Sequence, residues 1–249
     1  GEKISTFTER LFDEEELVNP GETGRMLLGK DFRYTKSQSI KFSLPGYVAG
    51  SEVNVVTNFA SKTMGGNARL TFQQNGNNIE SSNSDYISAT NDVAHSHYTI
   101  GNFEKSFPLT SGEDLTFTIN YNPSGTVYLA RLNYVAVNYE RRLALNNGTI
   151  AWSEKNGSSN MQYLLSGITG ETQVWDVTVP HRPTLMNVVT TDGVGAFSPT
   201  GVGYRSYVAF NPSITLPSPT LEAVVSNQNI HSEPTPDMII ISPTEYLDQ

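Results

Sequence analysis

The chain has 249 residues, enough for one large β domain or two smaller ones, and its 16 basic and 25 acidic residues give a net charge of −9. Without a basic run, this acidic balance argues against nucleic acid and anionic lipid as partners, and no apolar run is long enough to predict a membrane span. Because cysteine is absent, a disulfide scaffold, a zinc–thiolate site and a cysteine nucleophile are excluded within the chain.

The N-terminal residues 1–31 are expected to form an extension or an edge strand, with strand signals between Ile4 and Thr8. Four consecutive acids follow at residues 13–16. A calcium loop would space its oxygen ligands and include a bend-forming glycine, so this run predicts a solvated acidic turn or a helix start.

Residues 32–145 are predicted to form an antiparallel β-sandwich of jelly-roll type, because apolar and polar residues alternate in about eight segments. Asn75-Gly76 is a strong hairpin signal between two of these segments. The longest segment, residues 126–139, changes its apolar phase between Leu132 and Val135, which indicates a bulge or burial on both faces.

A second, smaller β region is predicted for residues 146–210, after the turn sequence Asn146-Asn147-Gly148. Residues 211–236 are rich in proline, which is typical of an extended connector. The expected short strands of this part lie at residues 149–153, 160–166, 173–179, 185–190, 204–210 and 221–225.

The last segment, residues 237–249, contains an apolar run at 238–241 followed by helix-start residues. Ser242 is suited to an N-cap, Pro243 to the first turn and Glu245 to a capping box. We therefore expect the first strand and helix start of an α/β domain that is absent from this chain, with the strand added to an exposed sheet edge.

No catalytic or cofactor-binding residue is predicted, and the only metal candidates are His95 and His97, which would share one strand face. A third ligand is not evident, so two surface histidines are the alternative reading. Ser206 lacks the glycine spacing of a nucleophile elbow. The glycine pairs at residues 193–195 and 201–203 do not join a strand to a helix, and they predict hairpin tips.

The two tryptophans are the candidates for stacking on a sugar ring. Trp175 alternates in phase with Val177 and Val179, which predicts a core position. Trp152 is left undecided between core and surface. Together with His95 and His97, Trp152 is therefore a candidate contact for a ligand or partner.

An ordered set of motifs resembles the region that precedes the catalytic domain in gingipain-like cysteine peptidases, with the PorU-type sortases of the Bacteroidetes type IX secretion system as the nearest match. The motifs are residues 173–180 (QVWDVTVP), 227–231 (NQNIH) and 237–243 (DMIIISP), with looser agreement at 19–25 and 138–143. One position departs from the family pattern, because Val179 precedes Pro180 where the family has aspartate.

The resemblance implies a cell-surface, outer-membrane-associated protein whose caspase-like domain, with a His/Cys dyad beyond Gln249, removes sorting domains from exported proteins and joins those proteins to a lipopolysaccharide. This chain would be its non-catalytic N-terminal β part. The implied partners are the C-terminal catalytic domain, outer-membrane secretion components and exported cargo. The alternative is a stand-alone cell-surface module for adhesion or carbohydrate binding.

Overall fold

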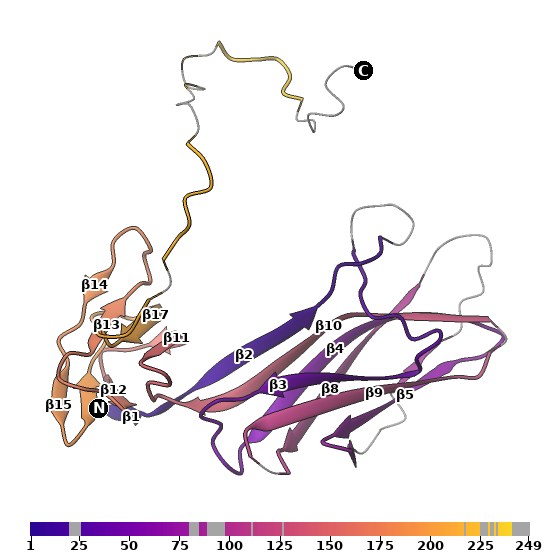
Figure 1. The fold of residues 1–249 in the computed structure, drawn as a ribbon, viewed down its shortest axis with the longest axis horizontal. Coiled ribbons are helices and arrows are strands. Elements are labelled where there is room, and N and C mark those ends of the chain that lie inside the picture. Colours follow the sequence, from indigo (N-terminus) through magenta and orange to yellow (C-terminus); the bar gives the residue numbers. More distant parts are fainter. Residues whose placement is uncertain are drawn as a thin grey trace. The chain divides into compact units, whose positions relative to one another are not determined.

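All regular elements in the described part of the chain are β-strands, so the predicted all-β class is confirmed (Figure 1). Residues 1–214 form one unit and residues 215–249 form another. The computed structural model describes residues 1–19, 26–79, 85–88, 98–110, 112–125, 127–216, 218–224, 229, 232 and 234–240.

The larger sandwich contains two sheets, and the chain passes back and forth between them as in a jelly roll, which confirms the predicted type. The first sheet has, in spatial order, β2 (Thr6–Glu14), β10 (Val127–Arg142), β4 (Glu52–Met64) and β8 (Thr99–Pro108). The second has β3 (Ser37–Ser43), β9 (Asp114–Pro123), β5 (Ala68–Gln74) and β6 (Asn77–Ile79), with β7 (Tyr86–Ile87) also paired to β5.

Between these sheets lies an apolar core that the alternating residues of each strand fill. On β9, for example, Leu115, Phe117 and Ile119 are fully buried. Each such side chain contributes about 1.5–3 kcal/mol when it is removed from water. The polar residues between them, Thr116 and Thr118, lie on the opposite face of the sheet, which is why the alternation could be recognised in the sequence.

A β-bulge in β10 explains the phase change of the longest segment. The register with β4 shifts between Leu132 and Tyr134, so that Asn133 is the extra residue. Before the bulge Leu132 is buried, and after it Val135 and Val137 are buried. The predicted bulge is therefore confirmed, and it returns the apolar residues to the core face.

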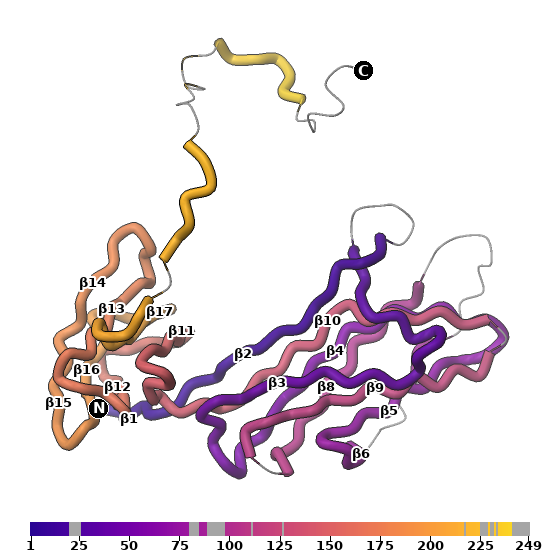
Figure 2. The backbone as a smooth tube through the Cα atoms, in the orientation of Figure 1, coloured from indigo at the N-terminus to yellow at the C-terminus, as the bar shows by residue number. Residues whose placement is uncertain are grey.

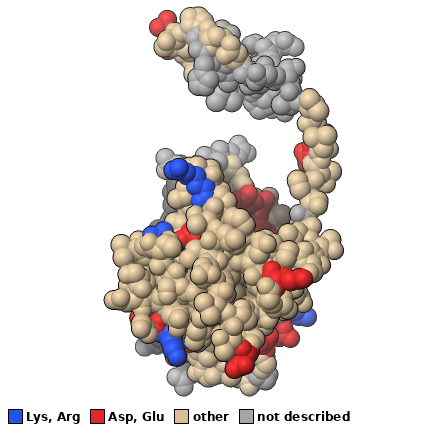
Figure 3. Space-filling view, turned by 90° about the vertical axis from the view of Figure 1, so that its left-hand side faces the viewer, with Lys and Arg blue, Asp and Glu red and all other residues tan. Residues whose placement is uncertain are grey.

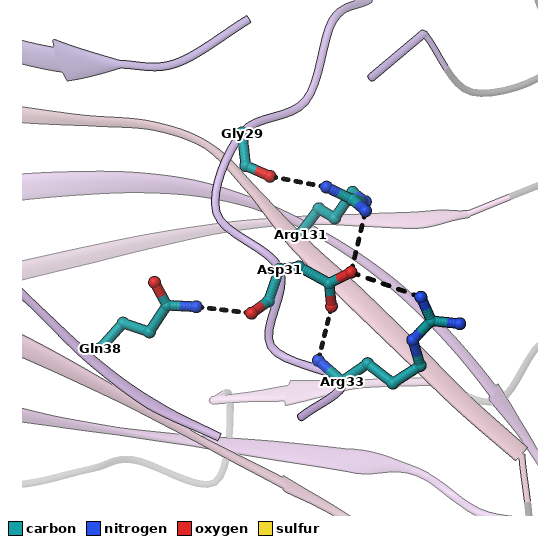
Figure 4. A network of polar contacts seen from close by, with 5 residues as sticks. All are labelled: Gly29, Asp31, Arg33, Gln38 and Arg131. Atoms are coloured by element: carbon teal, nitrogen blue, oxygen red, sulfur yellow. Dashed lines mark hydrogen bonds and ion pairs between the residues drawn. The ribbon is translucent and has the colours of Figure 1, made fainter. Parts of the chain in front are cut away.

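A polar network beside this bulge attaches the segment between β2 and β3 to β10 (Figure 4). Arg131 donates to the Asp31 carboxylate at 2.8 Å and to the Gly29 carbonyl oxygen at 3.0 Å. The backbone N–H of Arg33 donates to the same carboxylate at 2.7 Å. Gln38 donates to the Asp31 carbonyl oxygen at 2.6 Å. One carboxylate therefore organises the turn that leads into β3.

Asp31→Ala is expected to lower the free energy of unfolding by about 1–3 kcal/mol, since Arg131 and the Arg33 amide lose a charge-assisted acceptor. Urea denaturation measures this change. Lys41→Ala, at an exposed position on β3, is the control and should stay within about 0.5 kcal/mol of the parent chain. An Asp31 variant as stable as this control would contradict the structural role.

The acidic run does not form a turn or a helix start, because Asp13 and Glu14 are the last residues of β2. The Lys30 ammonium lies 3.8 Å from Asp13 and also pairs with Glu15. The expectation of a turn or helix start is wrong because these acids have a cationic partner and a strand ladder with β10.

The smaller β region has its own core between two four-stranded sheets. β1 lies parallel to β12, so the first residues of the chain belong to this region. One sheet contains β1 (Glu2–Ile4), β12 (Met161–Ser166), β16 (Val194–Phe197) and β15 (Val189–Thr191). The other contains β11 (Thr149–Gly157), β17 (Gly203–Phe210), β13 (Gln173–Asp176) and β14 (Thr184–Leu185).

Two expected strands near the C-terminus are absent from the described residues. Residues 221–224 lie in no strand, and Leu221 and Val224 are exposed. Met238, Ile239 and Ile240 are also in no strand and are 73–80% exposed, so the expected pairing with a sheet edge is wrong for these three. Apolar runs form strands only where a second layer covers them, and nothing described covers these. Residues 241–249, with the expected helix start, lie outside the described residues.

Candidate functional site

The metal candidates His95 and His97 lie outside the described residues, so the structure does not place them. Across the described part of the chain, no cluster of three or more His, Asp or Glu side chains is arranged to hold a metal ion. Nor does any helix there have the length and apolar character needed to cross a membrane.

Trp152 lies in the core of the smaller region and is 4% exposed. Its ring centroid is 5.2 Å from that of Tyr207 in a stacked pair, 6.0 Å from Tyr163 and 6.1 Å from Phe197. The three partner rings come from β17 in one sheet and from β12 and β16 in the other. Each aromatic pair contributes about 0.5–1.5 kcal/mol of stability beyond the area it buries. Trp152 therefore packs as a core residue in this structure, with other rings against its own.

Trp175 is not a core residue, which corrects the sequence-based expectation. On β13 the buried residues are Val174 and Asp176, so the Trp175 side chain lies on the opposite, outer face and is partly exposed. The expectation assumed one continuous strand from Trp175 to Val179. β13 ends at Asp176, and the alternation used for the inference therefore extends past the strand.

The two glycine pairs have different roles. Asp192 and Gly193, with φ of 51° and 75°, form the tight turn between β15 and β16, so the predicted hairpin tip is confirmed there. The segment around Gly201 is not a hairpin tip, because it connects β16 in one sheet to β17 in the other. A Cβ at Gly201 would lie 1.8 Å from a guanidinium nitrogen of Arg205, so a larger residue here would require the flexible end of that side chain to move.

A groove lies where the two β regions join. Figure 2 traces the chain from β1 of the smaller region into β2 of the larger sandwich. At this point the Leu143 N–H donates to the Ser5 carbonyl oxygen at 2.8 Å, so two segments cross the junction side by side. The junction groove has a volume of about 610 Å³ and is lined by Glu2, Lys3, Ile4, Ser5, Thr6, Phe7, Thr8, Glu52, Asn54, Asn138, Tyr139, Glu140 and Glu154.

The junction groove is acidic and polar. Four of its lining residues are glutamates and one is a lysine. The Thr6 hydroxyl donates to the Glu140 carboxylate at 2.8 Å, and Asn138 donates to Asn54 at 3.2 Å. Carboxylates and amides in this arrangement can accept hydrogen bonds from a donor-rich group. The lining contains no histidine or cysteine.

Burial raises the pKa of Tyr163 to about 12 and also raises the pKa of Tyr207, because the interior disfavours the phenolate. The folded state thus keeps protons that the unfolded state loses near pH 10. Stability is fully present below pH 10 and falls as pH rises towards the folded pKa. Each tyrosine should remove up to about 1.4 kcal/mol per pH unit in this range.

Urea denaturation at pH 9.5 and 11.5 measures this alkaline loss. A chain carrying Tyr163→Phe and Tyr207→Phe should lose less stability over the same interval. It should still lose some, because burial also raises the pKa of Tyr139 to about 12. If the parent chain and the double variant lose the same free energy of unfolding over this interval, burial does not raise the pKa values of these two tyrosines.

No protein-family model matches this chain, and no curated protein matches it. Among solved structures, dimeric latent PorU from Porphyromonas gingivalis matches with a TM-score of 0.77 and 24% identity. The match covers 95% of this chain but only 23% of that chain, and it shows a shared fold. The infectious bursal disease virus VP2 particle, at 12% identity over 82% of this chain and 39% of that chain, has a TM-score of 0.24, too low to support an argument.

Proposed function

We propose that this chain is the non-catalytic N-terminal β part of a cell-surface, type IX secretion sortase or gingipain-like cysteine peptidase. The observation that carries the proposal is the shared fold with PorU over 95% of the chain. The ordered motifs at residues 173–180, 227–231 and 237–243 support it independently of the fold. Since the chain spans only 23% of that PorU chain, the proposed whole protein is much longer.

In this proposal, catalysis belongs to a further C-terminal domain with a His/Cys dyad. The β part supports that domain, or it docks outer-membrane secretion components and exported cargo. The junction groove suits cargo or partner segments rich in hydrogen-bond donors, because glutamate and amide side chains line it. No observation on the described residues favours the alternative of a stand-alone adhesion or carbohydrate-binding module.

Deletion of residues 1–214 from the intact gene, in the producing cells, tests the proposal. Unprocessed exported proteins that keep their C-terminal sorting domains should accumulate, as measured by immunoblot, and the intact gene supplied in trans should restore processing. The purified 249-residue chain should cleave none of these proteins. Wild-type processing by the deletion strain, or cleavage by the isolated chain, would refute the proposal. An immunoblot for the remaining polypeptide confirms that the truncated protein is still made.

A further inference from the structure

The two sandwiches of this molecule differ in the chemistry of their outer sheet faces. In the larger sandwich, the outer face of β3, β9 and β5 is polar throughout. Ser39, Thr118 and Gln73 lie opposite one another across the three strands, and Lys41 lies opposite Thr116. This is the normal composition of an antiparallel sheet face that meets water, and it provides an internal reference.

The outer face of β11, β17, β13 and β14 does not follow this pattern. Ala151, Val208, Trp175 and Leu185 lie opposite one another in register, one on each of the four strands. We name these four residues the apolar row. Phe210, two residues further along β17, extends it on the same face. Leu185 is 55% exposed, so the row is not covered by the described residues at that end.

The apolar row itself carries no charge. The charged residues on the strands of this sheet lie outside the row: Glu154 and Lys155 on β11, Asp176 on β13 and Arg205 on β17. Figure 3 shows few charged side chains over the part of the molecule turned toward the viewer. Depletion of charge with an aromatic residue at the centre is the composition of a protein interface core.

Trp175 lies within the row, between Val208 and Leu185. The groups around it favour a protein surface over a sugar as the binding partner. Its indole N–H donates to the Gln173 side-chain oxygen at 3.0 Å, so both groups are already paired. Its neighbours along the row are aliphatic. A sugar site needs polar groups that hold hydroxyls in place, whereas an apolar protein surface needs only this kind of aromatic anchor.

We propose that the apolar row is the surface on which a second folded domain of the same polypeptide packs, through an uncharged apolar patch of its own. This inference rests on the proposed function, which makes the chain part of a longer protein. The missing charge on the row requires a partner surface without charge, because an unpaired charge buried against it would be costly. The PorU chain, of which this chain covers 23%, has most of its length available for such a domain.

Hydroxyl-radical footprinting with mass spectrometry tests the inference on the purified 249-residue chain and on the intact protein. Oxidation of Trp175 should fall severalfold in the intact protein. Trp152, which is 4% exposed, is the internal control and should be little oxidised in both. Equal oxidation of Trp175 in the two samples would overturn the inference. Protection that rises with the concentration of the isolated chain would overturn it in favour of a second copy, and protection by a neutral oligosaccharide would overturn it in favour of a glycan.

Trp175→Ala, compared with Gln73→Ala on the polar reference face, supplies a second readout. Limited proteolysis of the intact protein should release the β part faster in the Trp175 variant than in the Gln73 variant. Identical release rates would contradict the inference. The proposed function fails separately, if the deletion strain processes exported proteins normally. If the intact protein is active but Trp175 is exposed in it, only the inference that a second domain packs on the apolar row is refuted.

Discussion

Asp85→Ala is expected to lower the free energy of unfolding by about 3–5 kcal/mol, because it leaves an uncompensated buried ammonium. Asp85 is 2% exposed, and its two carboxylate oxygens accept hydrogen bonds from Lys105 at 2.7 and 2.8 Å. The same ammonium lies 5.5 Å from the centre of the Phe72 ring. This pair connects the end of the second sheet, just before β7, to β8 of the first.

Urea denaturation of the single variant measures the loss. The control replaces both charges with apolar groups, Asp85→Leu with Lys105→Met, and should recover most of the stability because no buried charge remains. If the single variant stays within about 1 kcal/mol of the parent chain, the pair is not buried in solution and the packing of the two sheets at this edge is wrong.

Trp152→Ala is expected to cost about 3–5 kcal/mol, as the removal of a large buried aromatic side chain does. Its ring contacts Tyr207, Tyr163 and Phe197, which cannot all move to fill the cavity. Trp175→Ala in the isolated chain is the matched comparison and should cost less than about 1 kcal/mol, since that ring lies on the outer face.

Denaturation of both tryptophan variants, followed by far-ultraviolet circular dichroism, measures the two losses. The order of the two effects matters more than their size, because it distinguishes the structure from the sequence-based expectation. A larger loss for Trp175→Ala than for Trp152→Ala would place β13 in the opposite register, with Trp175 in the core.

Much of the larger sandwich could be predicted from the sequence, because its strands expose one face and bury the other. The alternation of Leu115, Phe117 and Ile119 with polar residues reports this directly. The bulge could also be predicted, because an extra residue at Asn133 moves the apolar residues of the strand from even to odd positions. The pairing of strands that are far apart in the sequence could not be predicted. β1 joins β12, more than 150 residues away, on the basis of contacts that no local pattern encodes.

The smaller region was harder to predict because its strands are short. β13 and β14 have four and two residues, too few for a period to be established. For this reason the outer position of Trp175 was missed. The available signal was the in-phase Gln173, a polar residue two positions earlier on the same face. The apolar row could not be found at all without the register, since its four residues are spread from 151 to 208.

The candidate sites show a similar division. The junction groove combines residues from positions 2 to 154, which only the topology brings together. The apolar run at 238–240 was read as a buried strand, but local composition does not reveal whether a covering layer is present. The family resemblance, by contrast, used short ordered motifs, and the fold shared with PorU agrees with it over nearly the whole chain.

Under the proposed function, these residues belong to a much longer secreted peptidase. An immunoblot of the producing cells, with an antibody raised against residues 1–214, tests it most directly. We expect a surface-associated band several times heavier than the 27.3 kDa of this chain. A mature protein of 27.3 kDa, with no longer form at any growth stage, would contradict the claim.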